Sequence, residues 1–331
     1  MKAKDLAKEL GISEAAISLA LNNKPGVSTR TRNRVKEAAL AAGMDLTGRP
    51  VCSAITPIYL IYYRKKGAVL TDSSFFTELT RGVESGCAEG GYPVRTLNIY
   101  NRTKLEQSLR KISKDGASGV ILMGTEMEQD DFATLAFSDL HIILLDNHFI
   151  SSKVDSVQIA NEDGAFSAVN YLIHRKKIRP GYLQSSVPIT NFSERKTGFL
   201  RALAHNNMPA SDLIVHSLSP SIDGAASDMD ELICRGEKLA TCYFADNDLI
   251  AIGAIRALRN HGYRIPEDIA IVGFDDIPMC EYTEPPLTTV HVPKKYMGLV
   301  AAQRLIATSG EKTYYPVNIM VSTNLVVRNS I

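Results

Sequence analysis

The hydrophobic pattern of the chain changes near residue 45, from short amphipathic helices to apolar strands that alternate with helices. In the first part, apolar residues recur at helical spacing, which predicts helices over Lys4–Leu10, Glu14–Leu21 and Thr29–Ala42. Ser13 is well suited to cap the second helix, while Gly11 and Gly43 end the first and third. Helix, short turn, helix, loop and helix within 44 residues is the layout of a helix-turn-helix domain.

Beyond residue 57 the apolar runs are continuous and short, as in buried strands. Strands are predicted at Ile58–Tyr63, Val94–Ile99, Gly119–Met123, His141–Leu145, Gly181–Leu183, Ala240–Phe244 and Ile269–Gly273. Helices are predicted between them at Phe76–Glu89, Lys104–Lys114, Glu162–Arg175, Glu194–Asn207, Leu249–His261 and Lys295–Thr308. This alternation indicates parallel sheets covered on both faces. Because this body spans about 270 residues, two lobes are expected rather than one.

Composition and charge sharpen this division. The 331 residues are 45% hydrophobic and 22% charged, which excludes a disordered or fibrous protein. The net charge is only +1, but residues 1–44 carry eight basic and four acidic side chains, a charge of +4. The remaining 29 basic and 32 acidic residues give −3. A basic head on a mildly acidic body predicts that only the head contacts nucleic-acid phosphates.

Several classes of protein are disfavoured by what the sequence lacks. The first residues have no apolar segment typical of a secretory signal, and no run approaches the length of a membrane span. The five cysteines are scattered and fit thiols in a reducing cytosol: Cys52, Cys87, Cys234, Cys242 and Cys280. No H-x-x-x-H occurs, and no histidine lies near a cysteine pair at zinc-ligand spacing, so neither a metal nor a cofactor is expected. We expect a cytoplasmic protein without a membrane partner.

Motifs in both parts of the chain match one family in the correct order. The head carries K-D-L-A, the G-I-S turn, I-S-x-x-L-N and K-P-G-V-S-x-x-T-R-x-R-V. The body carries SFFTELTRGVESGCAEGGY, ILMGTEM, LLDN, ERKTGFLRAL, FADNDLIAIGAIRAL, IPEDIAIVGFDD and PPLTTVHVPKKYMG. Over nearly its whole length the sequence resembles the LacI/GalR family of bacterial transcription regulators.

The resemblance implies an α/β protein with an all-α helix-turn-helix head and a two-lobe, periplasmic-binding-protein-like body with parallel sheets. The implied divisions are a DNA-binding domain at 1–44, a linker at 45–57 and an effector-binding and dimerisation domain at 58–331. Within the body, the N-lobe would span about 58–156 and 288–319, and the C-lobe about 157–287 and 320–331. A small ligand would bind between the lobes, where open α/β sheets place their ligand sites. The family also implies a homodimer on a pseudo-palindromic double-stranded DNA operator.

The second helix of the head is the expected recognition helix. Because such a helix reads bases from its first turns, the expected DNA-binding surface is Ser13, Glu14, Ala15, Ser18, Leu19 and Asn22. Glu14 can accept a hydrogen bond from cytosine N4, and Ala15 or Leu19 can contact a thymine methyl group. Two alternatives stay open, since Ser13 also suits a helix cap and Leu19 can pack inward. The expected core of the head includes Ile17, Ala20 and Leu21.

Phosphate contacts are expected beside this surface, at Thr29, Arg32 and Lys24, although a solvated basic face explains the same residues. Such contacts make the affinity for DNA fall steeply with salt. Many relatives have an arginine where this chain has Leu19, so its operator half-site should differ from theirs.

The linker departs from the family pattern. Members usually carry a Pro-Asn-x-x-Ala-Arg-x-Leu stretch that folds on DNA and inserts a leucine into the minor groove. Residues 45–57 lack this stretch and contain Gly48 and Pro50, which disfavour a short helix. We therefore expect minor-groove insertion to be weak or absent, with specificity carried mainly by the heads.

Residues that match the effector contacts of the family lie at strand ends and helix starts: Phe75, Phe76, Asp146, Asn191, Arg195, Asn247, Phe274 and Asp275. Asp146 and Asp275 are predicted to end strands, where carboxylates can accept hydrogen bonds from sugar hydroxyls. Asp275 is favoured over Asp276 because alternate strand residues point in opposite directions. Arg195 offers a rigid fork of donors, and at least one of the two adjacent phenylalanines can stack on a ring.

This residue set suits a neutral polyhydroxylated sugar, and it predicts a ligand-responsive repressor of carbohydrate-utilisation genes. A nucleobase between the two phenylalanines is the alternative, but Ile189 stands where a purine-sensing relative would need a polar anchor. Control by a purine-like co-repressor or by a protein partner therefore remains open.

Two other classes compete with a regulator. An enzyme is disfavoured because the sequence has no G-x-G-x-x-G, G-x-x-x-x-G-K-[ST], G-x-S-x-G or H-E-x-x-H motif. A transport-type solute-binding protein is disfavoured by the basic head and the missing signal.

Overall fold

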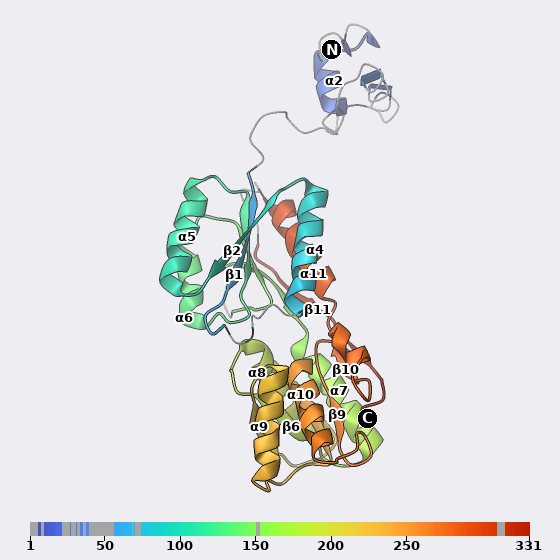
Figure 1. The fold of residues 1–331 in the computed structure, drawn as a ribbon. Helices are drawn as coiled ribbons and strands as arrows, with labels where there is room; N and C mark the ends of the chain where they lie inside the picture. Colours follow the sequence, from blue (N-terminus) through green and yellow to red (C-terminus); the bar gives the residue numbers. More distant parts are fainter. Residues whose placement is uncertain are drawn as a thin grey trace. The chain divides into compact units, whose positions relative to one another are not determined.

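The computed structural model divides the chain into two units, residues 1–55 and 56–331, and each is considered by itself. Within them the structure describes residues 6–7, 10–21, 27, 31, 34–35, 38–39, 56–67, 69, 74–149, 153–309 and 315–331. Figure 1 shows the elements of both units. In the described part of the chain, no helix is long and apolar enough to cross a membrane.

The head is held together by a small apolar core. Helix α2 spans Glu14–Leu21, as the sequence predicts, and Ser13 Oγ accepts a hydrogen bond of 3.1 Å from the amide of Ala16 at its start. Helical residues on either side of α2 supply the rest of a core that comprises Leu6, Ala7, Ile17, Ala20, Val35 and Ala39. Arg34 donates to the carbonyl of Leu10 over 3.4 Å, which ties the third helical segment to the end of the first.

The N-lobe is a parallel six-stranded sheet in the order β11-β5-β4-β3-β1-β2. Its strands are β1 (Ile58–Tyr63), β2 (Val94–Ile99), β3 (Gly119–Met123), β4 (Ile142–Leu145), β5 (Asp155–Ile159) and β11 (Asn318–Val321). The helical segments of this lobe are α4 (Ser74–Gly90), α5 (Arg102–Lys114), α6 (Gln129–Phe132), η1 (Ala133–Phe137) and α11 (Lys294–Thr308). Figure 1 shows α4 and α11 on one face of the sheet and α5 on the other, so the inner strands are buried on both sides.

The C-lobe repeats this architecture on a smaller scale. Its parallel sheet has the order β7-β6-β8-β9, formed by β6 (Gly181–Ser185), β7 (Val215–Leu218), β8 (Cys242–Ala245) and β9 (Ala270–Val272). The helical segments are α7 (Asn161–Lys176), α8 (Thr190–His205), α9 (Ile222–Cys234), α10 (Asp248–Asn260) and η2 (Pro278–Glu281). An antiparallel pair of β10 (Thr289–His291) and β12 (Asn324–Val326) lies where the chain passes between the lobes.

Two differences from the predicted elements matter for function. Helix α8 begins at Thr190 rather than at the expected Glu194, so that Asn191 and Arg195 lie one turn apart on the same helix. Helix α9, with the sequence IDGAASDMDELIC, is absent from the predicted set; its buried residues are two alanines and one methionine, Ala225, Ala226 and Met229. Both helices contribute residues to the sites described below.

Candidate effector cavity

A small cavity of about 40 Å³ lies between the two lobes, at the carboxyl ends of strands from both sheets. Its lining residues come from seven separate stretches of both lobes and include seven of the eight predicted effector contacts. The full set is Val69, Phe75, Phe76, Thr125, Asp146, Ile189, Asn191, Phe192, Arg195, Asn247, Leu249, Asp275 and Ile277. The cavity therefore combines an apolar wall with a few convergent polar groups, as small-molecule sites do.

Asp146 is the polar centre of the N-lobe wall. It follows β4 with a positive φ of 63°, which turns its side chain away from the strand direction. One carboxylate oxygen accepts from Thr125 Oγ1 over 2.5 Å, and the other accepts from Asn191 Nδ2 over 2.9 Å. Because Asn191 belongs to the C-lobe, this second bond joins the lobes. Burial of the carboxyl group raises its pKa to about 7.

Arg195 is the polar centre of the C-lobe wall and is almost completely buried. Its Nε donates to Asn161 Oδ1 over 2.9 Å, and its Nη1 donates to the carbonyl of Asp246 over 2.6 Å. The guanidinium lies 3.8 Å from the centroid of the Phe274 ring, within cation–π range. Its remaining arm, Nη2, lies 3.0 Å from Asp275 Oδ1. Every edge of the guanidinium is thus fixed before a ligand arrives.

Asp275 lines the cavity, but the backbone conformation that places it there differs from the predicted one. Strand β9 ends at Val272, so Asp275 and Asp276 do not alternate along a strand but occupy a turn, with φ of 113° and 53°. The turn separates them all the same: Asp275 lines the cavity, whereas Asp276 pairs with His291 and with Arg328.

A buried carboxyl group that is not among the predicted site residues holds this turn in place. Asp248, the first residue of α10, accepts from the amide of Ile277 over 3.0 Å and from Thr289 Oγ1 over 2.5 Å. Burial raises the pKa of Asp248 to about 7. Asp246, whose pKa burial raises to about 6, likewise accepts from the amide of Ser185. The sequence signal for both was the ADND segment at the end of β8, in which only Asn247 was chosen.

Asn247 and Phe274 have supporting positions. Asn247 lines the cavity, and its Oδ1 caps α10 by accepting from the amide of Ile250 over 3.0 Å. Phe274 is fully buried and is absent from the lining, because its ring packs beneath the Arg195 guanidinium instead. The structure thus places Phe274 as a support for Arg195 rather than at the cavity surface.

Phe75 and Phe76 form the apolar wall at the start of α4. Both line the cavity, and their rings meet edge to face with centroids 5.1 Å apart. An edge-to-face pair holds both rings in place without exposing both faces to one ligand. A ligand ring can stack on one of them, whereas a nucleobase sandwiched between two parallel faces does not fit this arrangement.

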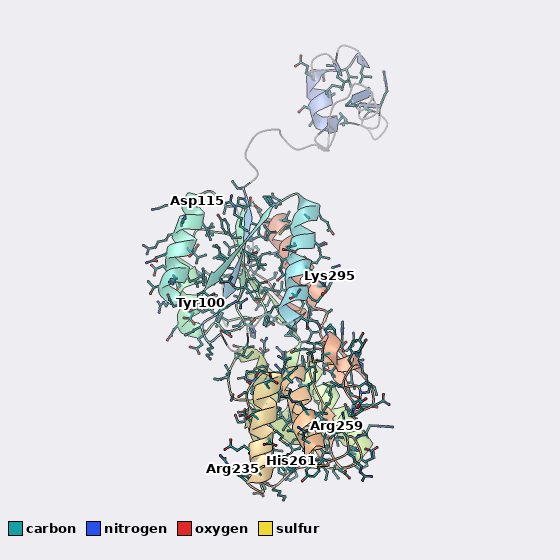
Figure 2. All side chains as sticks on the ribbon, viewed as in Figure 1. Tyr100, Asp115, Arg235, Arg259, His261 and Lys295 are labelled. Atoms are coloured by element: carbon teal, nitrogen blue, oxygen red, sulfur yellow. The ribbon has the colours of Figure 1, made fainter. Side chains whose placement is uncertain are left out.

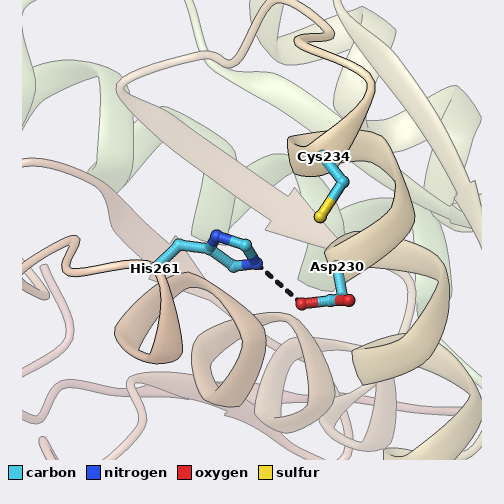
Figure 3. Close-up of side chains that lie close together, drawn as sticks. All are labelled: Asp230, Cys234 and His261. Atoms are coloured by element: carbon cyan, nitrogen blue, oxygen red, sulfur yellow. Dashed lines mark hydrogen bonds and ion pairs between the residues drawn. The ribbon is translucent and has the colours of Figure 1, made fainter.

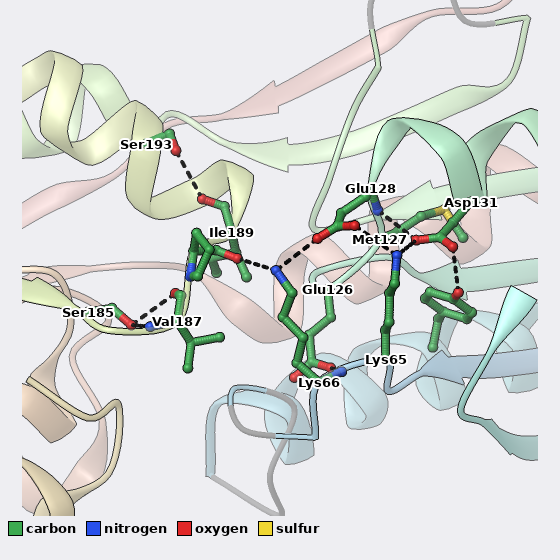
Figure 4. A network of polar contacts seen from close by, with 12 residues as sticks. Lys65, Lys66, Glu126, Met127, Glu128, Asp131, Ser185, Val187, Ile189 and Ser193 are labelled. Carbon is green, nitrogen blue, oxygen red and sulfur yellow. Dashed lines mark hydrogen bonds and ion pairs between the residues drawn. The ribbon is translucent and has the colours of Figure 1, made fainter.

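Beside the cavity, loop residues of the N-lobe contact the loop before α8 (Figure 4). Lys66 Nζ donates to the carbonyl of Pro188 over 2.7 Å and lies 2.9 Å from Glu128. Glu126 accepts from the amides of Lys66, Gly67 and Val69, which fixes the loop that carries the lysine. His148 Nδ1 lies 3.5 Å from Glu194, a second contact across the lobes.

Some of the predicted DNA-binding residues of the head lie among the described residues, and the others lie outside them. Glu14 and Ser18 are exposed on α2, Ser13 caps it, and Leu19 is half-buried, while Ile17 and Ala20 are buried in the core of the head. Asn22, Thr29, Arg32, Lys24 and the side chain of Ala15 lie outside the described residues, as does the linker up to residue 55.

The fold and the cavity define the class: a two-lobe α/β protein with a cavity between its lobes and a helical head. Residues 169–331 match the periplasmic binding protein-like domain family. The chain is 30% identical to the HTH-type transcriptional repressor PurR of Mannheimia succiniciproducens, over 99% of this chain and 98% of that protein. It is 29% identical to the PurR of Pasteurella multocida, with the same two coverages.

Solved structures agree with this class in fold. The transcriptional regulator CelR in complex with cellobiose superposes with a TM-score of 0.74 at 24% identity, over 100% of this chain and 99% of that one. The lac repressor dimer bound to operator gives a TM-score of 0.71 at 20% identity, over 100% and 98%. The chain belongs to the LacI family of transcriptional regulators, which are DNA-binding repressors that respond to small ligands and are not enzymes.

Proposed function

We propose that this repressor is controlled by a neutral sugar bound in the cavity between the lobes. The proposal rests on the hydrogen bonding of Asp275. Its buried Oδ1 lies 3.0 Å from Arg195 Nη2 but accepts no well-aligned hydrogen bond from the described residues. A buried acceptor without such a donor favours a ligand that brings hydroxyl groups. Arg195, which lines the same cavity, holds the Asp275 carboxylate in place for that ligand.

The charges around the cavity argue for a neutral ligand. Asp146 and Asp275 are set against the single guanidinium of Arg195, which is itself engaged with Asp275. Lys294 turns its ammonium to the carbonyls of Asp275 and Asp276, outside the lining. Binding of a sugar phosphate or a sugar acid would therefore be unfavourable, because its negative charge would be desolvated beside two aspartates and no unpaired cation lines the cavity.

A purine is the second candidate because the relatives at 29–30% identity carry the name PurR. The residues of this chain favour it less. Ile189, which precedes α8 and lines the cavity, offers no hydrogen bond where a polar anchor for a base would stand. The edge-to-face geometry of Phe75 and Phe76 also offers no pair of parallel faces.

Ligand binding would act on DNA through the lobes. Asp146 and Thr125 contact the ligand from the N-lobe, and Asn191, Arg195 and Asp275 contact it from the C-lobe. A ligand that bridges the two walls stabilises whichever arrangement of the lobes brings them together, and shifts the population toward it. The head (1–44), the linker (45–57) and the body (58–331) are the units of this response, with a homodimer presenting two heads to two operator half-sites.

In the head, we assign base reading to Glu14, Ala15, Ser18, Leu19 and Asn22, and phosphate contact to Thr29 and Arg32. Ser13 caps the recognition helix beside them. Replacing Glu14 by alanine should relax the preference at one base pair of each half-site, since a single base contact contributes about 1–3 kcal/mol of discrimination. Selection from a randomised half-site measures this preference; an unchanged preference would remove Glu14 from the reading set.

The effector is tested by calorimetry and operator binding on the full chain, with neutral monosaccharides and disaccharides set against hypoxanthine and guanine. A sugar should bind and change operator affinity, and Asp275→Asn should weaken that binding roughly tenfold to a hundredfold while basal operator affinity stays the same. Asp276→Asn, outside the cavity, is the matched control. Binding of a purine in place of every sugar would overturn the proposal, and no effect of either class would favour control by a protein partner.

A further inference from the structure

A second cluster of ligand atoms lies on the C-lobe, outside the effector cavity. Asp230 and Cys234 stand one turn apart on α9, and His261 follows the last residue of α10. The Asp230 carboxylate, the Cys234 thiol and the His261 ring place one ligand atom each within 4.8 Å of one another (Figure 3). None of the three lines the cavity between the lobes, and Figure 2 shows His261 on the C-lobe near Arg235.

We infer that Asp230, Cys234 and His261 form a binding site for a divalent transition-metal ion of the zinc type. A carboxylate oxygen, a thiolate sulfur and an imidazole nitrogen are all ligands of Zn²⁺, at about 2.0–2.3 Å. The thiolate and imidazole discriminate against Mg²⁺ and Ca²⁺, which take oxygen ligands. Three protein ligands leave a fourth position of the tetrahedron to solvent.

The geometry is close to that of a bound ion. In a tetrahedral site with these bond lengths, ligand atoms are separated by roughly 3.3–3.8 Å. His261 Nε2 and Asp230 Oδ1 are now 2.6 Å apart, joined by a hydrogen bond, and every pair in the cluster is within 4.8 Å. Side-chain rotations that part His261 from Asp230 and draw in Cys234 would bring all three atoms onto one ion.

The two helices that carry the ligands are fixed against each other. A Cβ at Gly253 of α10 would lie 2.5 Å from the carbonyl of Ile222 at the start of α9, so only glycine permits this approach. One turn further along α10, Arg256 pairs with Asp223, the residue after Ile222 on α9, at 2.8 Å. Asp230 and Cys234 lie further along α9, and His261 lies at the end of α10. The packing of these two helices therefore assembles the site.

Electrostatics also favour a cation at this place. Cys234 is the last residue of α9, and His261 directly follows α10, so the carboxyl ends of two helices meet at the cluster. Each carries a partial negative charge that stabilises a nearby cation. The neighbouring Arg235 is turned to Glu231, one turn back on the same helix.

Binding exchanges protons for the ion. The Cys234 thiol loses its proton to solvent and the thiolate binds the metal. The neutral His261 ring now donates its Nε2 proton to Asp230. On binding, that nitrogen gives up its proton to solvent and Nδ1 takes one from solvent, so that Nε2 is free for the metal and the hydrogen bond to Asp230 is replaced by two bonds to the ion. Because the thiol must lose its proton, binding releases a proton and is weakened by acid.

The test is a titration of the full chain, freed of metal and kept reduced with a phosphine, with Zn²⁺ in competition with a chromogenic chelator. One ion per chain should bind, and Cys234→Ser, His261→Ala and Asp230→Asn should each weaken binding at least about tenfold. His174→Ala, which alters an exposed histidine of α7, is the matched control and should bind as the parent does. Melting curves without metal establish that each variant is folded.

Co²⁺ gives a readout that depends on the sulfur itself. The parent and His174→Ala should show the near-ultraviolet sulfur-to-cobalt charge-transfer absorption, and Cys234→Ser should lose it. The inference is overturned if zinc binds with less than one ion per chain, or if the three cluster variants retain the parental affinity. It is equally overturned if the charge-transfer absorption survives in Cys234→Ser, because the ion then lies on another cysteine.

Discussion

At the residue scale, the carboxyl groups around the cavity determine how the protein responds to pH. The pKa values of Asp146 and Asp248 are both about 7 because both groups are buried. An aspartate in an unfolded chain has a pKa near 3.9. Between these values the native state holds protons that the unfolded chain has released, and this difference stabilises the native state.

The free energy of unfolding should accordingly fall as the pH rises from 5 to 8, since the native state loses this advantage when its carboxyl groups ionise near pH 7. Each group contributes a slope of up to roughly 1.4 kcal/mol per pH unit in this window. Asp146→Asn keeps the shape of the side chain but cannot ionise, so its profile should be flatter than that of the parent. Urea unfolding at pH 5, 6, 7 and 8 compares the two; parallel profiles would contradict a raised pKa at Asp146.

At the scale of elements, helices α4 and α11 approach so closely that side chains are excluded between them. A Cβ at Gly298 would lie 2.1 Å from the carbonyl of Leu79, and one at Gly82 would lie 2.0 Å from that of Lys295. Glycines on both helices thus permit backbone-to-backbone contact. This contact positions the start of α4, where Phe75 and Phe76 form a wall of the cavity.

Gly298→Ala changes the free energy of unfolding through two opposing effects, so the sign of the change shows which effect is larger. Helix propensity alone would stabilise the protein by about 1 kcal/mol, because alanine is the better helix former. The clash with the Leu79 carbonyl should outweigh this gain and lower the free energy of unfolding by roughly 1–3 kcal/mol. Chemical denaturation measures the difference; a stabilised variant would show that the helices separate without cost.

Several strands of the fold could be predicted from the sequence, and others could not. The bounds of β1, β2 and β3 agree with the prediction. For β1 and β3, continuous apolar runs such as IYLIYY identify buried parallel strands. Strand β5, DSVQI, was missed because its buried polar residues are satisfied by partners distant in sequence, as when Arg304 pairs with Asp155 at 2.9 Å.

The residues that line the cavity were predicted better than the residues that hold them in place. Strand ends and helix starts indicated Asp146, Asn191, Arg195 and Asp275, because family motifs and strand topology place such residues at one edge. Asp248 was missed, although it holds the turn that presents Asp275, because its role depends on contacts with residues far along the chain. Periodicity reports which face of an element is buried, but it carries no information on such contacts.

At the scale of the whole molecule, the lobes are joined beside the cavity by Lys66, which spans from the N-lobe to the carbonyl of Pro188. Lys66→Met should remove this bond and weaken effector binding about fivefold, because a partly exposed charged hydrogen bond contributes on the order of 1 kcal/mol. Lys65→Met is the matched control: Lys65 pairs with Glu128 and Asp131, both within the N-lobe. Calorimetry on both variants checks the prediction, and equal effects would show that the contact between lobes is not the cause.

The division of charge between head and body leads to a prediction for operator binding. With +4 on the first 44 residues and −3 on the remainder, counterion release should come from the heads alone. The logarithm of operator affinity should fall linearly with the logarithm of salt concentration, with a slope of about −0.9 for each phosphate contact. A body without residues 1–44 should bind no DNA at any salt concentration.

Two arginines of the head separate phosphate contact from internal support. Arg32 is the proposed phosphate contact, whereas the Arg34 guanidinium donates to the carbonyl of Leu10 inside the head. Arg32→Gln should therefore make the salt slope of a dimer shallower by roughly 1.8, or 0.9 for each head. Arg34→Gln should leave the slope unchanged and lower the stability of the head instead, because the bond it removes is intramolecular. Fluorescence anisotropy over a salt series measures both slopes, and a slope altered only by Arg34→Gln would reverse the two assignments.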